Sequence, residues 1–77
     1  MSERHLADAQ RAIESVARES YGRLVAFLSA RTRDLPSAED ALGEALIAAL
    51  ATWPRDGVPN NPAAWLLTAA RRRLIDR

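Results

Sequence analysis

The chain contains 77 residues, with no cysteine, one histidine and a formal net charge of +1. A chain this short forms a single domain and buries only about 60–65% of the surface of its unfolded form, so it lacks room for both a full core and a deep catalytic cavity. The absence of cysteine excludes a disulfide framework and a thiolate metal site, and it fits a protein of the reducing cytoplasm.

The first third of the chain carries apolar residues at helical spacing and predicts one helix over residues 6–32. Glu14 and Arg18 stand four residues apart, in the order that favours an ion pair along a helix. Gly22 weakens this helix by about 1 kcal/mol relative to alanine. Polar residues fill the opposite face, so we expect an amphipathic helix that packs on one side.

A short break at residues 34–36, which ends in a proline, separates this helix from the next. Ser37, with Asp40 three residues later, matches a capping box and predicts a second helix over residues 38–53. Alanine is frequent there, which favours a helix and close contacts between helices. One stripe of this helix is apolar and is formed by Leu42, Ala45, Leu46, Ala49, Leu50 and Trp53.

A second stripe of the same helix carries two acids. Asp40, Gly43, Glu44 and Ile47 recur at helical spacing but lie off the apolar stripe, so we expect them to face solvent or a partner. On the residues alone an ordinary explanation stays open, in which Asp40 closes the capping box and Glu44 is a surface acid.

Residues 54–60 form the second break, because two prolines and a glycine within this stretch exclude regular structure. Asn61 followed by Pro62 is a helix N-cap with proline at the first helical position. The third helix is predicted over residues 62–77 and is still in progress at the last residue. We therefore expect one helical domain over residues 1–77 that is the N-terminal fragment of a longer protein.

Every basic residue of the chain is an arginine, and the last seven positions hold four of the eleven. These four are Arg71, Arg72, Arg73 and Arg77. Successive helical residues turn by about 100°, so the side chains fan around the helix and can grip phosphates from more than one direction. The alternative is that arginines near a helix C-terminus offset the macrodipole and solvate the surface.

The sequence lacks the groups that catalysis requires. Its histidine, His5, lies near the N-terminus, no serine has a base partner at a recognisable spacing, and no glycine-rich phosphate loop is present. Asp40 and Glu44 have a spacing used in di-metal bundles, but such sites need a histidine three residues after a glutamate, and the sequence has none. No apolar run reaches the roughly 18 residues of a membrane span. We expect a binding protein without catalytic residues, metal, cofactor, small-molecule substrate or membrane partner.

Two segments together resemble a known family. Residues 38–45 resemble the helix by which bacterial sigma factors dock on core RNA polymerase, and residues 53–73 resemble the join into their promoter-melting helix. Their order and spacing are closest to the second conserved region of extracytoplasmic-function sigma factors, in a subgroup with a long C-terminal extension, over residues 10–77. The resemblance implies an all-α, three-helix bundle like sigma-factor region two, with the third helix cut near its C-terminal end.

The resemblance also implies a division of labour in transcription initiation. Asp40 and Glu44 match acids that sigma factors present to the clamp helices of the largest polymerase subunit, and Gly43 and Ile47 complete that surface. The third helix matches the element that meets the minus-ten promoter region and helps strand opening. An anti-sigma factor is a further candidate partner. The arginines that this helix would present to promoter DNA are Arg71, Arg72, Arg73 and Arg77.

The chain departs from the family pattern at three positions. Gly43 stands where many relatives have glutamine, so one polymerase contact is missing or replaced. Arg72 stands where many have asparagine, which favours phosphate contact over base reading. A tryptophan that primary sigma factors use in melting matches Ala64 rather than Trp65, which places Trp65 mainly in the core. The loop that captures a flipped base would follow Arg77.

Two other classes of protein remain as alternatives. A helical protein–protein interaction module without a nucleic-acid role would leave the arginines merely solvated. A small helix-turn-helix repressor needs a turn of three or four residues, and the longer break at 54–60 argues against it.

Overall fold

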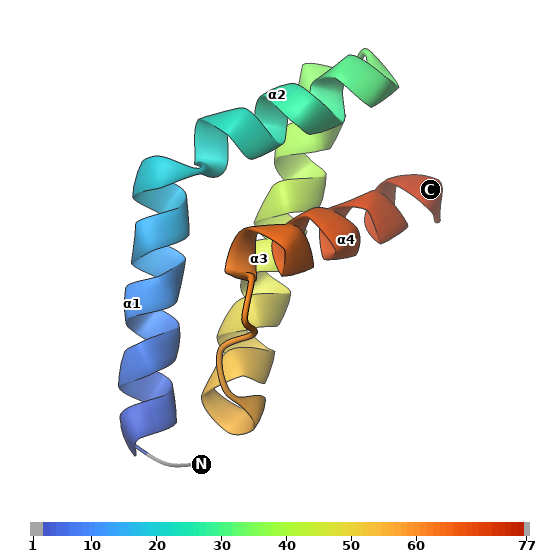
Figure 1. The fold of residues 1–77 in the computed structure, drawn as a ribbon. Helices are drawn as coiled ribbons and strands as arrows, with labels where there is room; N and C mark the ends of the chain where they lie inside the picture. Colours follow the sequence, from blue (N-terminus) through green and yellow to red (C-terminus); the bar gives the residue numbers. More distant parts are fainter. Residues whose placement is uncertain (1–2, 77) are drawn as a thin grey trace.

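The computed structural model describes residues 3–76, which form four α-helices and no strand (Figure 1). The helices are α1 (Glu3–Glu19), α2 (Tyr21–Thr32), α3 (Leu35–Asp56) and α4 (Pro62–Ile75). The central element is α3, which packs against each of the other three: α1 lies beside it, while α2 and α4 cross it. The predicted all-α class is confirmed, and the number of helices differs from the prediction by one.

The predicted helix over residues 6–32 is two helices that meet at Ser20. The Ser20 backbone leaves helical geometry (φ −122°, ψ −16°), yet its N–H donates to the Val16 carbonyl at 2.8 Å and its carbonyl accepts the Leu24 N–H at 3.0 Å. Figure 1 shows α2 turning away from α1 at this point. Both Val16 and Leu24 are buried, so the apolar spacing continues across the bend and gives no sign of it.

The start of α3 lies earlier than predicted because Asp34 caps it. The Asp34 carboxylate accepts the Ser37 N–H at 3.2 Å and the Ser37 hydroxyl at 2.7 Å. The predicted capping box of Ser37 and Asp40 is therefore wrong, since Ser37 lies inside the first turn as a donor to the cap. Pro36 fits the same turn because the first residues of a helix need no N–H partner within it.

The end of α3 lies later than predicted. The helix continues through Pro54 to Asp56, so the predicted break at 54–60 is shorter. Pro54 has no N–H to donate, and the helix forgoes one hydrogen bond there while the proline ring is buried. Gly57, with a φ of 93°, ends the helix, and its N–H donates to the Trp53 carbonyl at 2.8 Å.

The predicted start of α4 is confirmed. The Asn61 side chain accepts the Ala64 N–H at 3.1 Å, and Pro62 is the first helical residue. The helix runs to Ile75, and the last residue of the predicted range, Arg77, lies outside the described residues.

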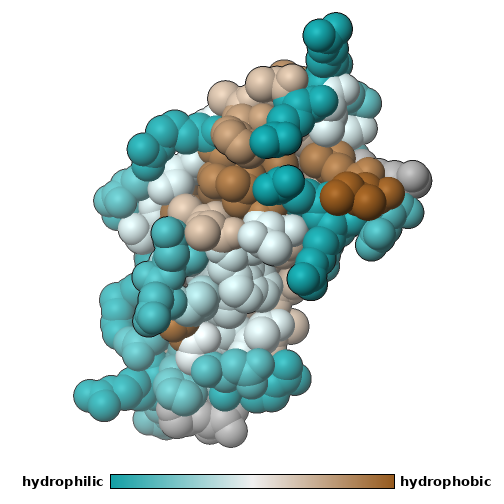
Figure 2. Space-filling model, turned by 45° about the vertical axis from the view of Figure 1, so that its right-hand side comes forward, coloured by the Kyte–Doolittle hydropathy of each residue, from teal (hydrophilic) through white to brown (hydrophobic). Residues whose placement is uncertain are grey.

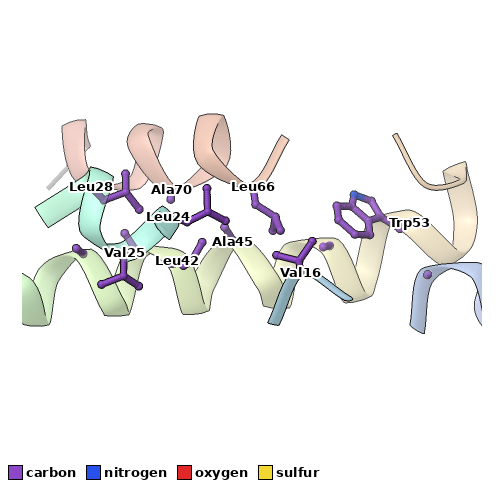
Figure 3. Close-up of a cluster of buried hydrophobic side chains, with 13 residues drawn as sticks. Val16, Leu24, Val25, Leu28, Leu42, Ala45, Trp53, Leu66 and Ala70 are labelled. Atoms are coloured by element: carbon purple, nitrogen blue, oxygen red, sulfur yellow. The ribbon is translucent and has the colours of Figure 1, made fainter. Parts of the chain in front are cut away.

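The core is built from aliphatic side chains, alanines and one tryptophan, and all four helices contribute to it (Figure 3). Leu66 and Ala70 project from α4 toward α3, where alanines allow the two helices to approach closely. Trp53 is 1% exposed, and its ring meets the Trp65 ring edge-on at 5.3 Å between centroids, which fastens the end of α3 to the start of α4. The buried apolar residues are Ala9, Val16, Leu24, Val25, Leu28, Ala38, Ala41, Leu42, Ala45, Ala49, Trp53, Leu66 and Ala70.

Candidate functional site

One exposed face of α3 carries the first set of predicted site residues. Asp40, Gly43, Glu44 and Ile47 follow one another at helical spacing, away from the buried alanines. Asp40 is exposed, the Glu44 side chain is half exposed, and Ile47 is 67% exposed. A methyl group at Gly43 would meet nothing within 4 Å, so packing does not require glycine there. Asp40, Glu44 and Ile47 are exposed as predicted, whereas Gly43 is half-buried.

The same face continues to Leu50, three residues after Ile47, which is 53% exposed. The apolar pattern of the sequence groups Leu50 with the buried stripe, and the structure contradicts this. Two exposed aliphatic side chains therefore lie beside two carboxylates on this side of α3. We call Asp40, Gly43, Glu44, Ile47 and Leu50 the outer face of α3.

The described arginines at the end of α4 point to three different neighbours, as a turn of about 100° per residue predicts. Arg71 lines a groove beside α2, Arg72 lines a groove beside the loop that precedes α4, and Arg73 reaches α3. Arg71 and Arg72 are exposed, whereas the Arg73 side chain is only 33% exposed. The three guanidinium groups therefore do not form a single phosphate-binding surface.

Arg72 lies at a groove of about 480 Å³ on α4. Trp65 and Thr68 line this groove with it, together with Pro59 and Asn61. Trp65 is half-buried: it packs against the core and also lines the groove. The prediction that Trp65 lies mainly in the core therefore describes only one of its two contacts. An aromatic ring beside an arginine is a combination that can hold an unpaired base and its phosphate.

Arg73 joins the two predicted sites. Its Nε lies 3.4 Å from Glu44 Oε2, and its Nη1 donates to the Ala69 carbonyl at 3.1 Å. The ion pair links α4 to the outer face of α3. Sequence spacing could not reveal it, because the distance depends on how α3 and α4 cross.

Arg71 and Arg31 lie at a smaller groove of about 190 Å³ between the C-terminal ends of α2 and α4. Leu28, Leu74 and Ile75 supply its apolar lining, and Ile75 is 76% exposed. Figure 2 shows apolar side chains gathered on the upper part of the molecule with hydrophilic ones between them. The sequence did not predict this groove, since its lining comes from separate helices.

The described residues offer contact surfaces and show no metal cluster. Within residues 3–76, no group of three or more histidine, cysteine, aspartate or glutamate side chains is placed to hold a metal ion. In the same part of the chain, no helix combines the length and apolar character needed to cross a bilayer. The described site residues are carboxylates and aliphatic side chains on α3, and arginines with an aromatic ring on α4.

Comparison with known proteins identifies one matching family and one similar protein. The family described as Sigma-70 region 2 matches residues 16–77. An uncharacterized protein of Rhizobium meliloti (strain 1021) is 41% identical over 66 residues, which cover 86% of this chain. The match spans only 15% of the length of that relative. No solved structure matches the chain.

Proposed function

Because the chain belongs to the Sigma-70 region 2 family, we propose that it binds core RNA polymerase through the outer face of α3 and presents α4 to the minus-ten region of promoter DNA. The domain acts in transcription initiation by binding and carries out no chemical step of its own. Strand opening draws on the free energy of holding unstacked bases against the protein. The sequence motifs favour the extracytoplasmic-function type of sigma factor.

The observation that carries this proposal is the outer face of α3. Ile47 and Leu50 expose apolar surface on the same side of the helix as the carboxylates of Asp40 and Glu44. Exposed aliphatic side chains that lie beside charged ones suit contact with another protein. The positions of the two acids match those that sigma factors present to the clamp helices of the largest polymerase subunit, which supports that subunit as the partner.

The groove at Arg72 supports the DNA-binding half of the proposal. Arg72 is exposed, and Trp65 offers part of its ring in the same groove. A guanidinium group can contact a phosphate there while an unstacked base meets the aromatic ring. Arg71 is also exposed and is the second phosphate-contact candidate, and Arg77 remains a proposed contact outside the described residues.

Charge reversal on the outer face of α3 tests the polymerase-binding role. The double variant Asp40→Arg with Glu44→Arg should lower the affinity for cognate core RNA polymerase by roughly a hundredfold or more, because like charges then meet across the interface. The matched control is Glu14→Arg with Glu19→Arg, which makes the same change in charge at exposed positions of α1. The control should leave the affinity unchanged.

Fluorescence titration of labelled core polymerase measures the affinity, and circular dichroism verifies that each variant keeps its helices. A folded Asp40→Arg and Glu44→Arg variant that still binds core polymerase with full affinity would overturn the proposed role. That result would favour a helical protein–protein interaction module with some other partner.

A further inference from the structure

The Glu44–Arg73 ion pair gives Arg73 a position unlike that of its neighbours on α4. The guanidinium is held from two sides, with Nε 3.4 Å from Glu44 Oε2 and Nη1 donating to the Ala69 carbonyl at 3.1 Å. Its side chain is 33% exposed, whereas Arg71 and Arg72 are exposed. A guanidinium in these contacts has fewer N–H donors free for a phosphate than an exposed one.

The same contact restricts the conformational freedom of the Glu44 side chain before a partner binds. Half of the Glu44 side chain stays exposed on the outer face of α3 while Arg73 holds one carboxylate oxygen. A free glutamate loses rotamer freedom when a partner immobilises it, and this loss weakens binding. A glutamate that is already held loses less, so the ion pair favours association without touching the partner.

We propose that Arg73 is a positioning residue of the polymerase-binding surface, which holds Glu44 in the orientation that meets the polymerase, and that it is not a phosphate contact. This inference rests on the proposed function, since it takes the outer face of α3 as the polymerase surface. It moves Arg73 from the DNA-binding set to the polymerase-binding set. It also makes α4 a support for the docking helix α3.

Affinity for core RNA polymerase tests the positioning role. Arg73→Ala should lower the affinity about three- to tenfold, which is the size of effect expected from releasing one or two rotamer-rich side chains. Arg73→Lys keeps a positive charge within reach of Glu44 and should recover most of the loss. Arg18→Ala, at an exposed position of α1, is the control and should leave the affinity unchanged.

A double-mutant cycle separates positioning from a general loss of structure. If Arg73 acts through Glu44, Arg73→Ala has no further effect on polymerase affinity in a Glu44→Gln background. A merely structural role would lower the affinity by the same factor in both backgrounds and would lower the melting temperature as well. Equal losses in the two backgrounds therefore overturn the inference.

A DNA-binding measurement decides whether Arg73 supports polymerase binding or contacts a DNA phosphate. Holoenzyme assembled with the Arg73→Ala chain should keep the wild-type salt dependence on a promoter duplex that the holoenzyme has selected from a random-sequence pool. Arg72→Ala should flatten that dependence. A flatter slope with Arg73→Ala and an unchanged polymerase affinity would assign Arg73 to DNA instead.

The single variant Asp40→Arg separates the polymerase-binding role of the outer face of α3 from the positioning role of Arg73, because Asp40 lies outside the ion pair. If Asp40→Arg leaves polymerase affinity unchanged, the outer face of α3 is not the polymerase surface and the proposed function fails. If Asp40→Arg lowers the affinity and Arg73→Ala does not, only the positioning role of Arg73 is overturned.

Discussion

Leu42 and Leu50 are the same residue type on the same helix, yet Leu42 is fully buried and Leu50 is 53% exposed. Truncation to alanine should therefore affect stability at Leu42 and binding at Leu50. Leu42→Ala leaves a cavity among packed helices and should lower the free energy of unfolding by about 2–5 kcal/mol. That loss is severe for a domain of this length, whose total stability is on the order of 4–12 kcal/mol.

Leu50→Ala should change the free energy of unfolding by less than about 0.5 kcal/mol, because the side chain already faces solvent. It should instead weaken binding to core polymerase, since it removes apolar area from the outer face of α3. Urea unfolding and polymerase titration of both variants check this pair of expectations. A Leu50→Ala variant as unstable as Leu42→Ala would show that the outer face is part of the core.

The exposure of Asp40, Glu44 and Ile47 on α3 could be predicted from the sequence, and the contact of Glu44 with Arg73 could not. A helix repeats every 3.6 residues, so Asp40 and Ile47 fall on one side and the buried alanines on the other wherever the helix packs. The contact from Glu44 to Arg73 depends on the crossing of two helices that are far apart in the chain. Leu50 was misplaced because an aliphatic residue at helical spacing looks the same whether or not another helix covers it.

Two glycines of α3 and its C-cap differ in whether the backbone requires glycine. Gly43 lies in mid-helix with open space where a methyl group would go, and Gly57 has a φ of 93°. Gly43→Ala should stabilise the domain by about 0.5–1 kcal/mol, since alanine loses less backbone entropy in a helix. For a domain of this size the gain corresponds to a rise in Tm of roughly 2–8 °C.

Gly57→Ala should act in the opposite direction, because the Gly57 backbone (φ 93°, ψ 158°) lies in a region that only glycine adopts readily, and a side chain there costs about 1–3 kcal/mol. Thermal unfolding followed by circular dichroism compares the two variants under identical conditions. A rise in Tm for both variants would contradict the stated role of Gly57 in ending α3.

The boundaries of the helices could be predicted where local chemistry sets them. Asn61 followed by Pro62 is a local cap, and the structure confirms it. The start of α3 was misplaced because Asp34 and Ser37 are both able to cap, and only the backbone path shows which one does. Pro54 stays within α3 although it cannot donate a backbone N–H, and its ring is buried. Sequence rules for proline predict a helix break there and take no account of burial.

The two proposed surfaces, the outer face of α3 and the arginines of α4, are close neighbours. The described chain measures 40 × 25 × 18 Å along its principal axes, and the Glu44–Arg73 pair links the outer face of α3 directly to α4. Core polymerase and promoter DNA would therefore meet on adjacent sides of one small domain. The overall all-α architecture was accessible from the sequence, whereas the crossing of α4 over α3 that makes the surfaces adjacent was not.

The charge on α4 predicts how promoter binding responds to salt. Arg71→Ala and Arg72→Ala should each reduce the slope of log affinity against log salt by close to one unit, and the double variant by close to two, if each guanidinium neutralises one phosphate. The measurement is a titration of holoenzyme with its selected promoter duplex across a range of potassium chloride concentrations. Arg18→Ala on α1 should leave the slope unchanged, and an unaltered slope in the double variant would mean that the two arginines only solvate the helix end.

The edge-on contact between Trp53 and Trp65 also places both sources of tryptophan fluorescence at one point of the fold. The chain has only these two tryptophans, and both lie where α3 gives way to α4. One indole is sealed in the core while the other borders the Arg72 groove. The tryptophan emission, which can be excited apart from that of Tyr21, therefore arises from a single junction, with one indole shielded from solutes and the other within their reach. Unlabelled protein thus carries an optical reporter at the place where the proposed promoter-facing helix begins.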